Sequence, residues 1–264
     1  MIAWNRRWIV SGKHLAEIFG RLAAGARHLG GALLDLVYPQ DCIGCGRGPI
    51  LPDGSCLCDA CWTALPRIGP WQCPHCGDEL GPYAAGAGAC RSCARHKGLY
   101  FRGAAAVCRY EDVARRMVWE LKYRGDIRAV PWMGRELYGK LAEKDWFPQV
   151  EALIPVPLHW RRRVQRRFNQ SELLARAISR VAGKEVLPRA LQRRKQTTPQ
   201  VTLDRARRAE NVEGAFRLRR AKRIKGRVIL LVDDVMTTCA TAEVCSRALL
   251  DGGAKSVYVA IYAR

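Results

Sequence analysis

Residues 228–241 read Val-Ile-Leu-Leu-Val-Asp-Asp-Val-Met-Thr-Thr-Cys-Ala-Thr. Five β-prone apolar residues in a row predict a strand that is buried on both faces, as the strands of parallel sheets are. The two carboxylates and the hydroxyl-rich run that follow predict a binding loop, because ligands of open α/β sheets lie beyond the carboxyl ends of the strands. We therefore expect an α/β fold with a mainly parallel sheet organised around this strand.

The side chains of this loop suit a sugar phosphate. Asp233 and Asp234 can accept hydrogen bonds from neighbouring ribose hydroxyls. Backbone N–H groups and threonine hydroxyls of residues 237–241 lie where a helix is expected to begin, and so form an anion cradle. Two other interpretations are that the carboxylates cap a helix or bind magnesium for other chemistry. The threonine-rich continuation fits both of these less well.

The chain has 264 residues, enough for one good-sized domain and a smaller one, and its formal net charge is +21. Between Glu151 and Arg227 there are 22 lysines and arginines against 6 acidic residues. A field of this sign attracts polyanions, with nucleic acid as the leading candidate. The alternative is a solvated basic face that also attracts an anionic substrate.

Eight of the 12 cysteines fall in four C-x-x-C pairs. This spacing indicates metal ligation in a reducing compartment rather than a secreted disulfide framework. No apolar run is long enough to span a membrane, and the start of the chain shows no convincing signal peptide. We expect a cytoplasmic protein.

Residues 39–98 are expected to form the cysteine module. Each C-x-x-C turn directs two thiolates at one tetrahedral ion, and Gly46 and Gly77 follow the first and third pairs as in zinc knuckles. Sequential pairing gives a double zinc ribbon with two structural zinc ions, whereas cross-braced pairing remains the alternative. The predicted ligands are Cys42, Cys45, Cys58, Cys61, Cys73, Cys76, Cys90 and Cys93.

Residues 1–38 show apolar positions at helical spacing with basic residues between them. This pattern predicts an amphipathic helical extension. It could cover a neighbouring domain or rest on a membrane surface, and an acid-poor, arginine-bearing start is also compatible with an organellar transit peptide.

Residues 99–264 have the composition of an α/β domain. We expect strands at 103–109, 152–156 and 256–263, and helices at 111–123, 135–144, after Ser171 to about 181, and at 242–250. Cys108 and Cys245 are expected to be core thiols.

Two further segments predict contacts to a charged ligand. Pro155 and Pro157 force the strand at 152–156 into a loop, and five arginines between 161 and 167 follow, so this strand end is a candidate pyrophosphate site. For any single arginine, a solvated helix face is the simpler interpretation. The polar segment 189–216 has few apolar residues and predicts a mobile lid.

Residues 228–241 resemble the phosphoribosyl pyrophosphate (PRPP) loop of type I phosphoribosyltransferases. Cys239 stands where that loop normally has glycine. Its Cβ is expected to narrow the phosphate cradle unless φ stays negative. A thiol at a helix N-terminus is also expected to have a lowered pKa and to be prone to modification.

The ordered set of motifs resembles the ComF (ComFC/GntX) family of competence-associated proteins, which join an N-terminal zinc ribbon to a phosphoribosyltransferase domain. The carriers are the four C-x-x-C pairs, residues 121–126, 154–159, 166–170, 197–200, 203–211, 214–216 and 228–241. Arg167 is a second departure, because the family usually has Arg-Gly-Phe-Asn-Gln there.

The resemblance implies a fold, a site and a cofactor. The fold would be a Rossmann-like type I phosphoribosyltransferase, with Mg²⁺ arriving with PRPP, Asp233 and Asp234 as catalytic ribose ligands, and a link to imported single-stranded DNA. The implied substrate-binding residues are Val235, Met236, Thr237, Thr238, Cys239, Ala240, Thr241, Pro157, Leu158, His159, Arg205 and Arg208.

Two functions of different kinds remain open from the sequence. One is a phosphoribosyltransferase whose acceptor the residues do not specify. The other is a non-catalytic nucleic-acid-binding module in which the same pocket is a regulatory nucleotide site. A third hypothesis is a membrane-associated assembly factor that docks through residues 1–38, which could contact the membrane periphery or the competence machinery.

Overall fold

The computed structural model describes residues 41–48, 50–81, 90, 93, 99–158, 166–193, 216–219 and 221–264. The helical elements are α2 (Asp59–Thr63), α3 (Asp112–Trp119), the π-helix η3 (Glu120–Arg124), α4 (Val130–Ala142), the 3₁₀ turn η4 (Phe147–Gln149), α6 (Gln170–Ala182), the 3₁₀ turn η6 (Ala221–Arg223) and α8 (Ala240–Asp251). The strands are β1 (Ala104–Cys108), β2 (Ala152–Pro155), β3 (Glu185–Val186), β4 (Leu191–Arg193), β5 (Phe216–Leu218), β6 (Val228–Val235) and β7 (Ser256–Ala263).

Five strands form a parallel sheet in the order β1-β7-β6-β2-β3. The strand at 228–235 lies in the middle of the sheet, paired with β7 on one side and β2 on the other. Its first five residues are all buried, as the unbroken apolar run predicts for a parallel strand covered on both faces. Strands β4 and β5 pair with each other in a separate antiparallel hairpin.

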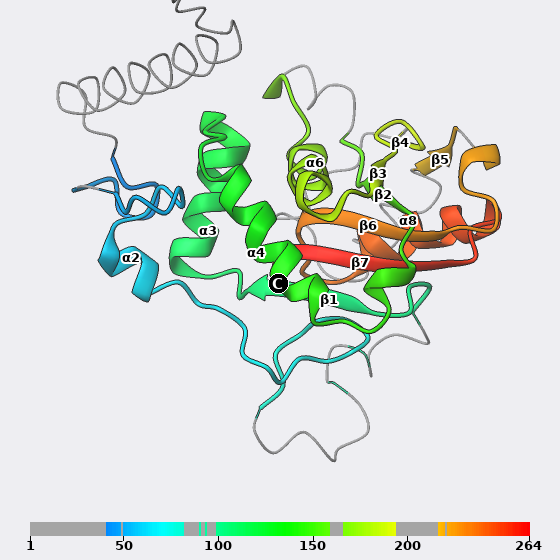
Figure 1. Ribbon diagram of the computed structural model, residues 1–264, viewed down its shortest axis with the longest axis horizontal. Coiled ribbons are helices and arrows are strands. Elements are labelled where there is room, and N and C mark those ends of the chain that lie inside the picture. The colour runs from blue at the N-terminus through cyan, green and yellow to red at the C-terminus, as the bar shows by residue number, and fades with distance from the viewer. Residues whose placement is uncertain are drawn as a thin grey trace, which may run out of the picture. The chain divides into compact units, whose positions relative to one another are not determined.

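Different helices cover the two faces of the sheet (Figure 1). Residues of α3, α4 and α6 share one apolar cluster with alternate residues of the strands, such as Leu230 and Val232. Residues of α8 share the other cluster with the intervening strand residues, such as Ile229 and Leu231. The result is a three-layer α/β arrangement, which leaves the carboxyl ends of the strands as the place for a ligand.

The cysteine-containing segment packs on both faces of this sheet at its β1 edge. Leu57, Cys61 and neighbours belong to the cluster that contains α3 and α4. Ile68, Cys73 and Cys76 belong to the cluster that contains α8. The N–H of Ile68 donates to the carbonyl of Val107 in β1, at 2.8 Å, so the linking segment runs along the edge strand.

The expected fold class is confirmed, with differences in detail. Helix α4 begins at Val130, five residues before the predicted start, because Pro131 is at a position in its first turn that needs no N–H partner. The helix expected at 111–123 ends in a π-helical turn, which the periodicity did not predict. The short strands β3, β4 and β5 were also not predicted.

Several predictions fall outside the described residues: the extension 1–38, His159 and most of the segment 189–216, including Arg205 and Arg208. Within the described residues, no helix combines the length and apolar character needed to cross a membrane.

Helices α4 and α6 pack closely at Gly134, where an added Cβ would overlap the Cβ of Ala177. We expect Gly134→Ala to lower the free energy of unfolding by about 1–3 kcal/mol, the usual cost of overpacking. Gly139→Ala in the same helix is the matched control, because nothing lies within 4 Å of that position. The control should raise stability by about 0.5–1 kcal/mol through helix propensity. Urea unfolding of both variants measures this, and equal effects would contradict the close packing.

Candidate ligand site at the carboxyl ends of β2 and β6

Two adjacent carboxylates occupy the end of β6 and are held by three partners. The hydroxyl of Ser171, in the first turn of α6, donates to Oδ1 of Asp233 at 2.9 Å. The N–H of Asp234 donates to the same oxygen at 2.9 Å. The ammonium of Lys122 lies 2.9 Å from Oδ2 of Asp234. Asp234 is buried and Asp233 is half-buried, so the pair is fixed and only partly open to solvent.

Lys122 reaches the carboxylates from the π-helical turn η3. Single π turns within helices are frequent at functional sites, and the wider turn changes which side chains face a given direction. Burial lowers the pKa of Lys122, but the charge and hydrogen bond of Asp234 and the charge of Asp233 outweigh it, so the pKa lies above its usual value. Lys122 therefore stays charged beside the two carboxylates.

The pKa of Asp233 is raised above the usual value of an aspartate. Burial and the charge of Asp234 raise the pKa of Asp233 to about 7, against the opposing effects of Lys122 and Ser171. A group with this pKa can gain or lose a proton near neutral pH when a ligand arrives.

The end of β2 lies beside this pair, because β2 and β6 are neighbours. Pro155 is the last residue of β2 and lies opposite Val232, so the proline ends the strand as predicted. Asn169 ties this end to α6, since its Nδ2 donates to the carbonyl of Val156 at 3.0 Å and its Oδ1 caps the helix at Ser171. Gln170 is buried, and its Nε2 has no hydrogen-bond partner within the described chain.

The turn 236–239 joins β6 to α8. Cys239 is the N-cap residue with φ of 61°, in the left-handed region, and its side chain makes no capping hydrogen bond. The condition of a negative φ is therefore not met, and the cysteine keeps the backbone conformation that favours glycine. Arg167, the other departure from a family glycine, also has a positive φ, of 65°.

The thiol of Cys239 does not have the predicted reactivity. Its side chain is 1% exposed, and burial raises the pKa of the thiol above its usual value, against the opposing charge of Arg264. The prediction of a lowered pKa rested on the position of the thiol at a helix N-terminus, where the dipole favours a thiolate, but burial outweighs this effect. In the left-handed conformation the thiol is buried among apolar residues such as Met236 and Cys245.

Arg264, which directly follows β7, stabilises this turn by hydrogen bonds to its carbonyl groups. Its Nη1 donates to the carbonyls of Met236 and Thr237 at 3.1 and 3.3 Å. Its Nε lies 3.8 Å from Oδ1 of Asp78, which follows Cys76 of the cysteine module by two positions. The side chain is 3% exposed, so one buried guanidinium contacts both the turn and the module.

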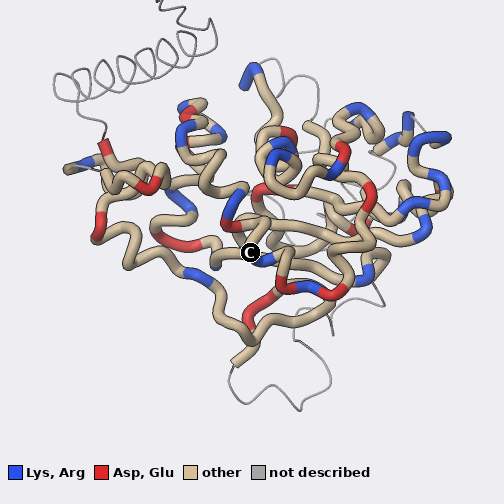
Figure 2. Tube along the Cα trace, in the orientation of Figure 1, with Lys and Arg blue, Asp and Glu red and all other residues tan. Residues whose placement is uncertain are grey.

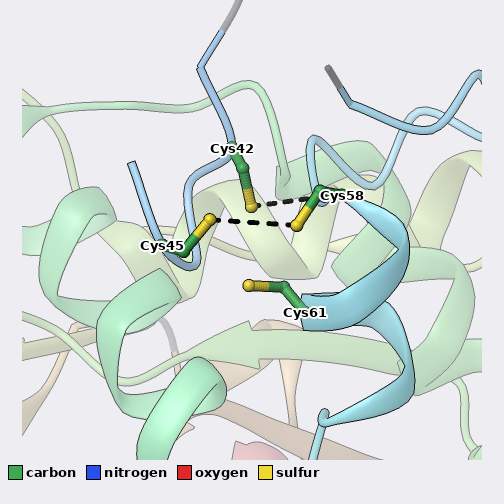
Figure 3. A group of neighbouring side chains, drawn as sticks. All are labelled: Cys42, Cys45, Cys58 and Cys61. Carbon is green, nitrogen blue, oxygen red and sulfur yellow. Dashed lines mark hydrogen bonds between the residues drawn. The ribbon is translucent and has the colours of Figure 1, made fainter. Parts of the chain in front are cut away.

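The eight predicted cysteine ligands form two clusters in sequential pairing. Cys42, Cys45, Cys58 and Cys61 make the first (Figure 3), and Cys73, Cys76, Cys90 and Cys93 make the second; within each cluster the sulfurs lie within 4.8 Å of one another. The cross-braced alternative is therefore wrong. In the first cluster, the N–H groups of Gly44 and Cys58 donate to the sulfur of Cys42 at 3.3 and 3.2 Å.

The geometry of both clusters fits a structural zinc ion. Tetrahedral ligation with Zn–S bonds of about 2.3 Å places sulfurs about 3.8 Å apart. The observed separations are 3.8 Å between Cys45 and Cys58 and 3.6 Å in the second cluster, for Cys73 with Cys93 and Cys76 with Cys90. Gly46 and Gly77 have the positive φ expected of knuckle glycines.

The structure brings together part of the predicted site. Asp233, Asp234, residues 235–241, Pro157 and Leu158 all belong to the ends of β2 and β6 or to the start of α8. Sequence reasoning assigned no role to Lys122, Ser171 or Arg264. The position of Lys122 at the end of an amphipathic helix could have suggested a role in the site. No pattern in the residues around Ser171 or Arg264 would have predicted theirs.

Comparisons with known proteins agree with the two cysteine clusters and identify relatives that cover most of the chain. A family model for a double zinc ribbon domain matches residues 33–95. Competence protein F of Haemophilus influenzae is 30% identical over 222 residues, 83% of this chain and 94% of that protein. DNA utilization protein YhgH of Salmonella typhi is 29% identical over 229 residues, 85% of this chain and 96% of that protein. Competence protein ComFC of Bacillus subtilis is 26% identical over 228 residues, 84% and 88% respectively.

The positive φ at Cys239 leads to a stability prediction. Cys239→Gly and Cys239→Ala both remove the buried thiol, but only the alanine keeps a Cβ in the left-handed region. We expect the glycine variant to be more stable than the alanine variant by about 1 kcal/mol. Urea unfolding of the two zinc-loaded variants measures the difference. An alanine variant of equal or greater stability would show that the turn is not strained.

The raised pKa of Asp233 leads to a pH prediction. Between its ordinary pKa of 3.8 and its folded pKa of about 7, the folded protein keeps a proton that the unfolded chain has lost. The stability of the parent relative to Asp233→Asn should therefore fall as pH rises through this window, by at most about 1.4 kcal/mol per pH unit. Urea unfolding of both proteins at several pH values tests this. A constant difference would exclude the raised pKa.

Proposed function

The chain belongs to the competence protein F (ComF) family, and from this premise and the site geometry we propose that it binds PRPP with Mg²⁺ and acts in the handling of imported single-stranded DNA. The observation that carries the PRPP proposal is the fixed carboxylate pair at the end of β6, directly followed by the first turn of α8. The relatives' names, competence protein and DNA utilization protein, support the cellular role.

The carboxylate pair suits the ribose of PRPP. Each carboxylate has one oxygen engaged, Oδ1 of Asp233 by Ser171 and Oδ2 of Asp234 by Lys122. Their positions are thus set before a ligand binds, and the other oxygens can accept from the 2- and 3-hydroxyls. Preorganised acceptors of this kind lower the entropic cost of binding.

The turn 236–239 and the start of α8 suit the 5-phosphate. The first N–H groups of a helix have no carbonyl partner within it, and the helix dipole favours an anion there. Thr237 is exposed and Thr238 half-buried, so their hydroxyls are accessible. Arg264 donates to two carbonyls of this turn and so fixes its backbone.

The pyrophosphate would lie at the end of β2. Pro157 and Leu158 are the last described residues of this segment, and Gln170 places a buried amide nitrogen without a described partner beside it. Mg²⁺ would neutralise pyrophosphate oxygens and arrive mainly with the ligand, since it keeps several waters and binds phosphates readily. His159, Arg205 and Arg208 remain predicted contacts of this part of the ligand.

Transfer of the phosphoribosyl group would need an acceptor. In that reaction an oxocarbenium-like transition state would be stabilised by the carboxylates, while the leaving pyrophosphate would be neutralised by cations. Cys239 replaces the glycine that the family normally has in this turn, at φ of 61°, and this departure supports a second function, a regulatory nucleotide pocket without turnover. Release of pyrophosphate with candidate acceptors distinguishes the two.

The remaining assignments complete the proposal. The two cysteine clusters would hold structural zinc and supply much of the folding free energy of their segment. The division into 1–38, 39–98 and 99–264, a cytoplasmic location and a peripheral membrane contact of residues 1–38 stay predictions.

We expect PRPP with Mg²⁺ to bind the zinc-loaded protein saturably and the double variant Asp233→Asn, Asp234→Asn not to bind measurably. Each amide keeps one acceptor oxygen but loses the second acceptor and the negative charge of the carboxylate, and Lys122 would then face the ligand without its counter-charge. Isothermal titration calorimetry measures both. Asp251→Asn, at the exposed far end of α8, is the matched control and should bind like the parent.

Unchanged affinity in the double variant would place PRPP elsewhere and reject the site. Absence of binding to the parent would reject PRPP as the ligand. Unfolding curves of all three proteins separate a lost site from a lost fold.

A further inference from the structure

Two exposed aromatic rings lie at the end of α3 and in η3. Trp119 is 41% exposed and Tyr123 is 63% exposed, and they are two of six large apolar side chains that are exposed among the described residues. The four buried residues of α3, which include Met117 and Val118, form its core-facing side. The rings are therefore not needed to cover the sheet.

Arginines surround these rings. The ring centroids of Trp119 and Tyr123 are 5.8 Å apart and the rings are tilted by 39°. The guanidinium carbons of Arg116 and Arg124 lie 5.5 and 5.9 Å from the Trp119 centroid. Arg166, which precedes α6, lies 5.0 Å from the Tyr123 centroid. Two separate segments thus contribute cations to one aromatic pair.

The cluster keeps a positive charge. Glu120 is ion-paired to Arg116 at 2.9 Å and lies 3.9 Å from Arg124. The single negative charge of Glu120 offsets one of the three positive charges of Arg116, Arg124 and Arg166, so the group of rings and arginines keeps a net positive charge and attracts anions. In Figure 2 lysine and arginine positions surround the upper end of α3, with acidic positions among them. Exposed rings beside unneutralised arginines are the elements of single-strand recognition, in which bases stack on rings and phosphates pair with cations.

We propose that Trp119 and Tyr123 form a stacking surface for unpaired bases of a single-stranded nucleic acid, with Arg116, Arg124 and Arg166 contacting its phosphates. The inference rests on the DNA-handling part of the proposed function and adds the surface that holds the strand. A duplex is excluded as the preferred ligand because its base faces are already stacked. Tyr123 follows Lys122 directly, so the strand would lie next to the carboxylate pair.

The test measures binding of a fluorescein-labelled oligothymidylate of about 15 nucleotides by anisotropy at about 50 mM salt. The zinc-loaded full chain is compared with Trp119→Ala, Tyr123→Ala and the double variant. Trp119→Phe and Tyr123→Phe keep a ring at each position. Trp71→Ala is the matched control, because Trp71 is 58% exposed and no arginine is recorded over its ring within the described chain.

We expect each alanine variant to raise Kd about fivefold or more, since stacking contributes about 1–3 kcal/mol per base. The phenylalanine variants and Trp71→Ala should stay within about twofold of the parent. Arg116→Gln with Arg124→Gln should also reduce the dependence of log Kd on log salt by about one to two.

Three results would overturn the inference. If the parent binds but the alanine variants bind equally well, the strand lies elsewhere, although DNA handling stands. If a duplex of the same sequence competes as well as the single strand, the bases are not stacked on the rings. If sedimentation shows that the variants dissociate a dimer of the parent, the rings are covered by a second copy.

Loss of PRPP binding is a separate result. The PRPP titration on Trp119→Ala should match the parent, so a failure of the stacking surface and a failure of the PRPP site are distinguishable. If the parent binds no oligonucleotide at low salt, both the stacking surface and the DNA-handling role are rejected while the PRPP site remains open to test.

Discussion

Two carboxylates side by side at the end of a buried strand repel each other, and the arrangement of the site follows from how that repulsion is offset. Asp233 and Asp234 are compensated by a lysine, a hydroxyl and a backbone N–H. The lysine comes from η3 and the hydroxyl from α6, so the carboxylates join two helical elements to the central strand. A proton is the remaining means of compensation: burial and then the charge of Asp234 raise the pKa of Asp233 to about 7. Lys122 therefore offsets part of this negative charge and fixes Asp234 in the position from which it would accept a ribose hydroxyl.

The sequence was informative where the signal is local. The apolar run 228–232 predicted a doubly covered strand, and the C-x-x-C spacing predicted two metal clusters, because each depends only on residues close together in the chain. Lys122 and Arg264 were not predicted as parts of the site, because their partners are distant in the sequence. Asp234 lies more than a hundred positions after Lys122, and Met236 lies 28 positions before Arg264. The left-handed φ values of Cys239 and Arg167 were not predicted, because residues with a side chain ordinarily prefer a negative φ. The turn instead keeps a conformation set by the strand and helix on either side of it.

The cysteine module is part of the core rather than an independent unit attached to it. Its first half shares a cluster with α3 and α4, and its second half shares one with α8. The module thus covers both faces of the sheet at β1, whose N–H and carbonyl groups would otherwise form an exposed edge. Metal ligation and sheet packing are expected to stabilise one another, and the predicted boundary near residue 98 lies within one compact unit, Cys42–Arg264.

Arg264 couples metal binding at the second cysteine cluster to anion binding at the turn 236–239, because it contacts both. Its guanidinium lies against Asp78 on one side and holds two carbonyls of the turn on the other. If metal in the second cluster favours the arrangement in which both contacts form, metal raises the affinity of the turn for an anion. By reciprocity of linkage, an anion on the turn must then slow or reduce the loss of that metal by the same free energy. The rate at which a chelator removes zinc from the second cluster would thereby measure whether an anion is bound at the turn 236–239.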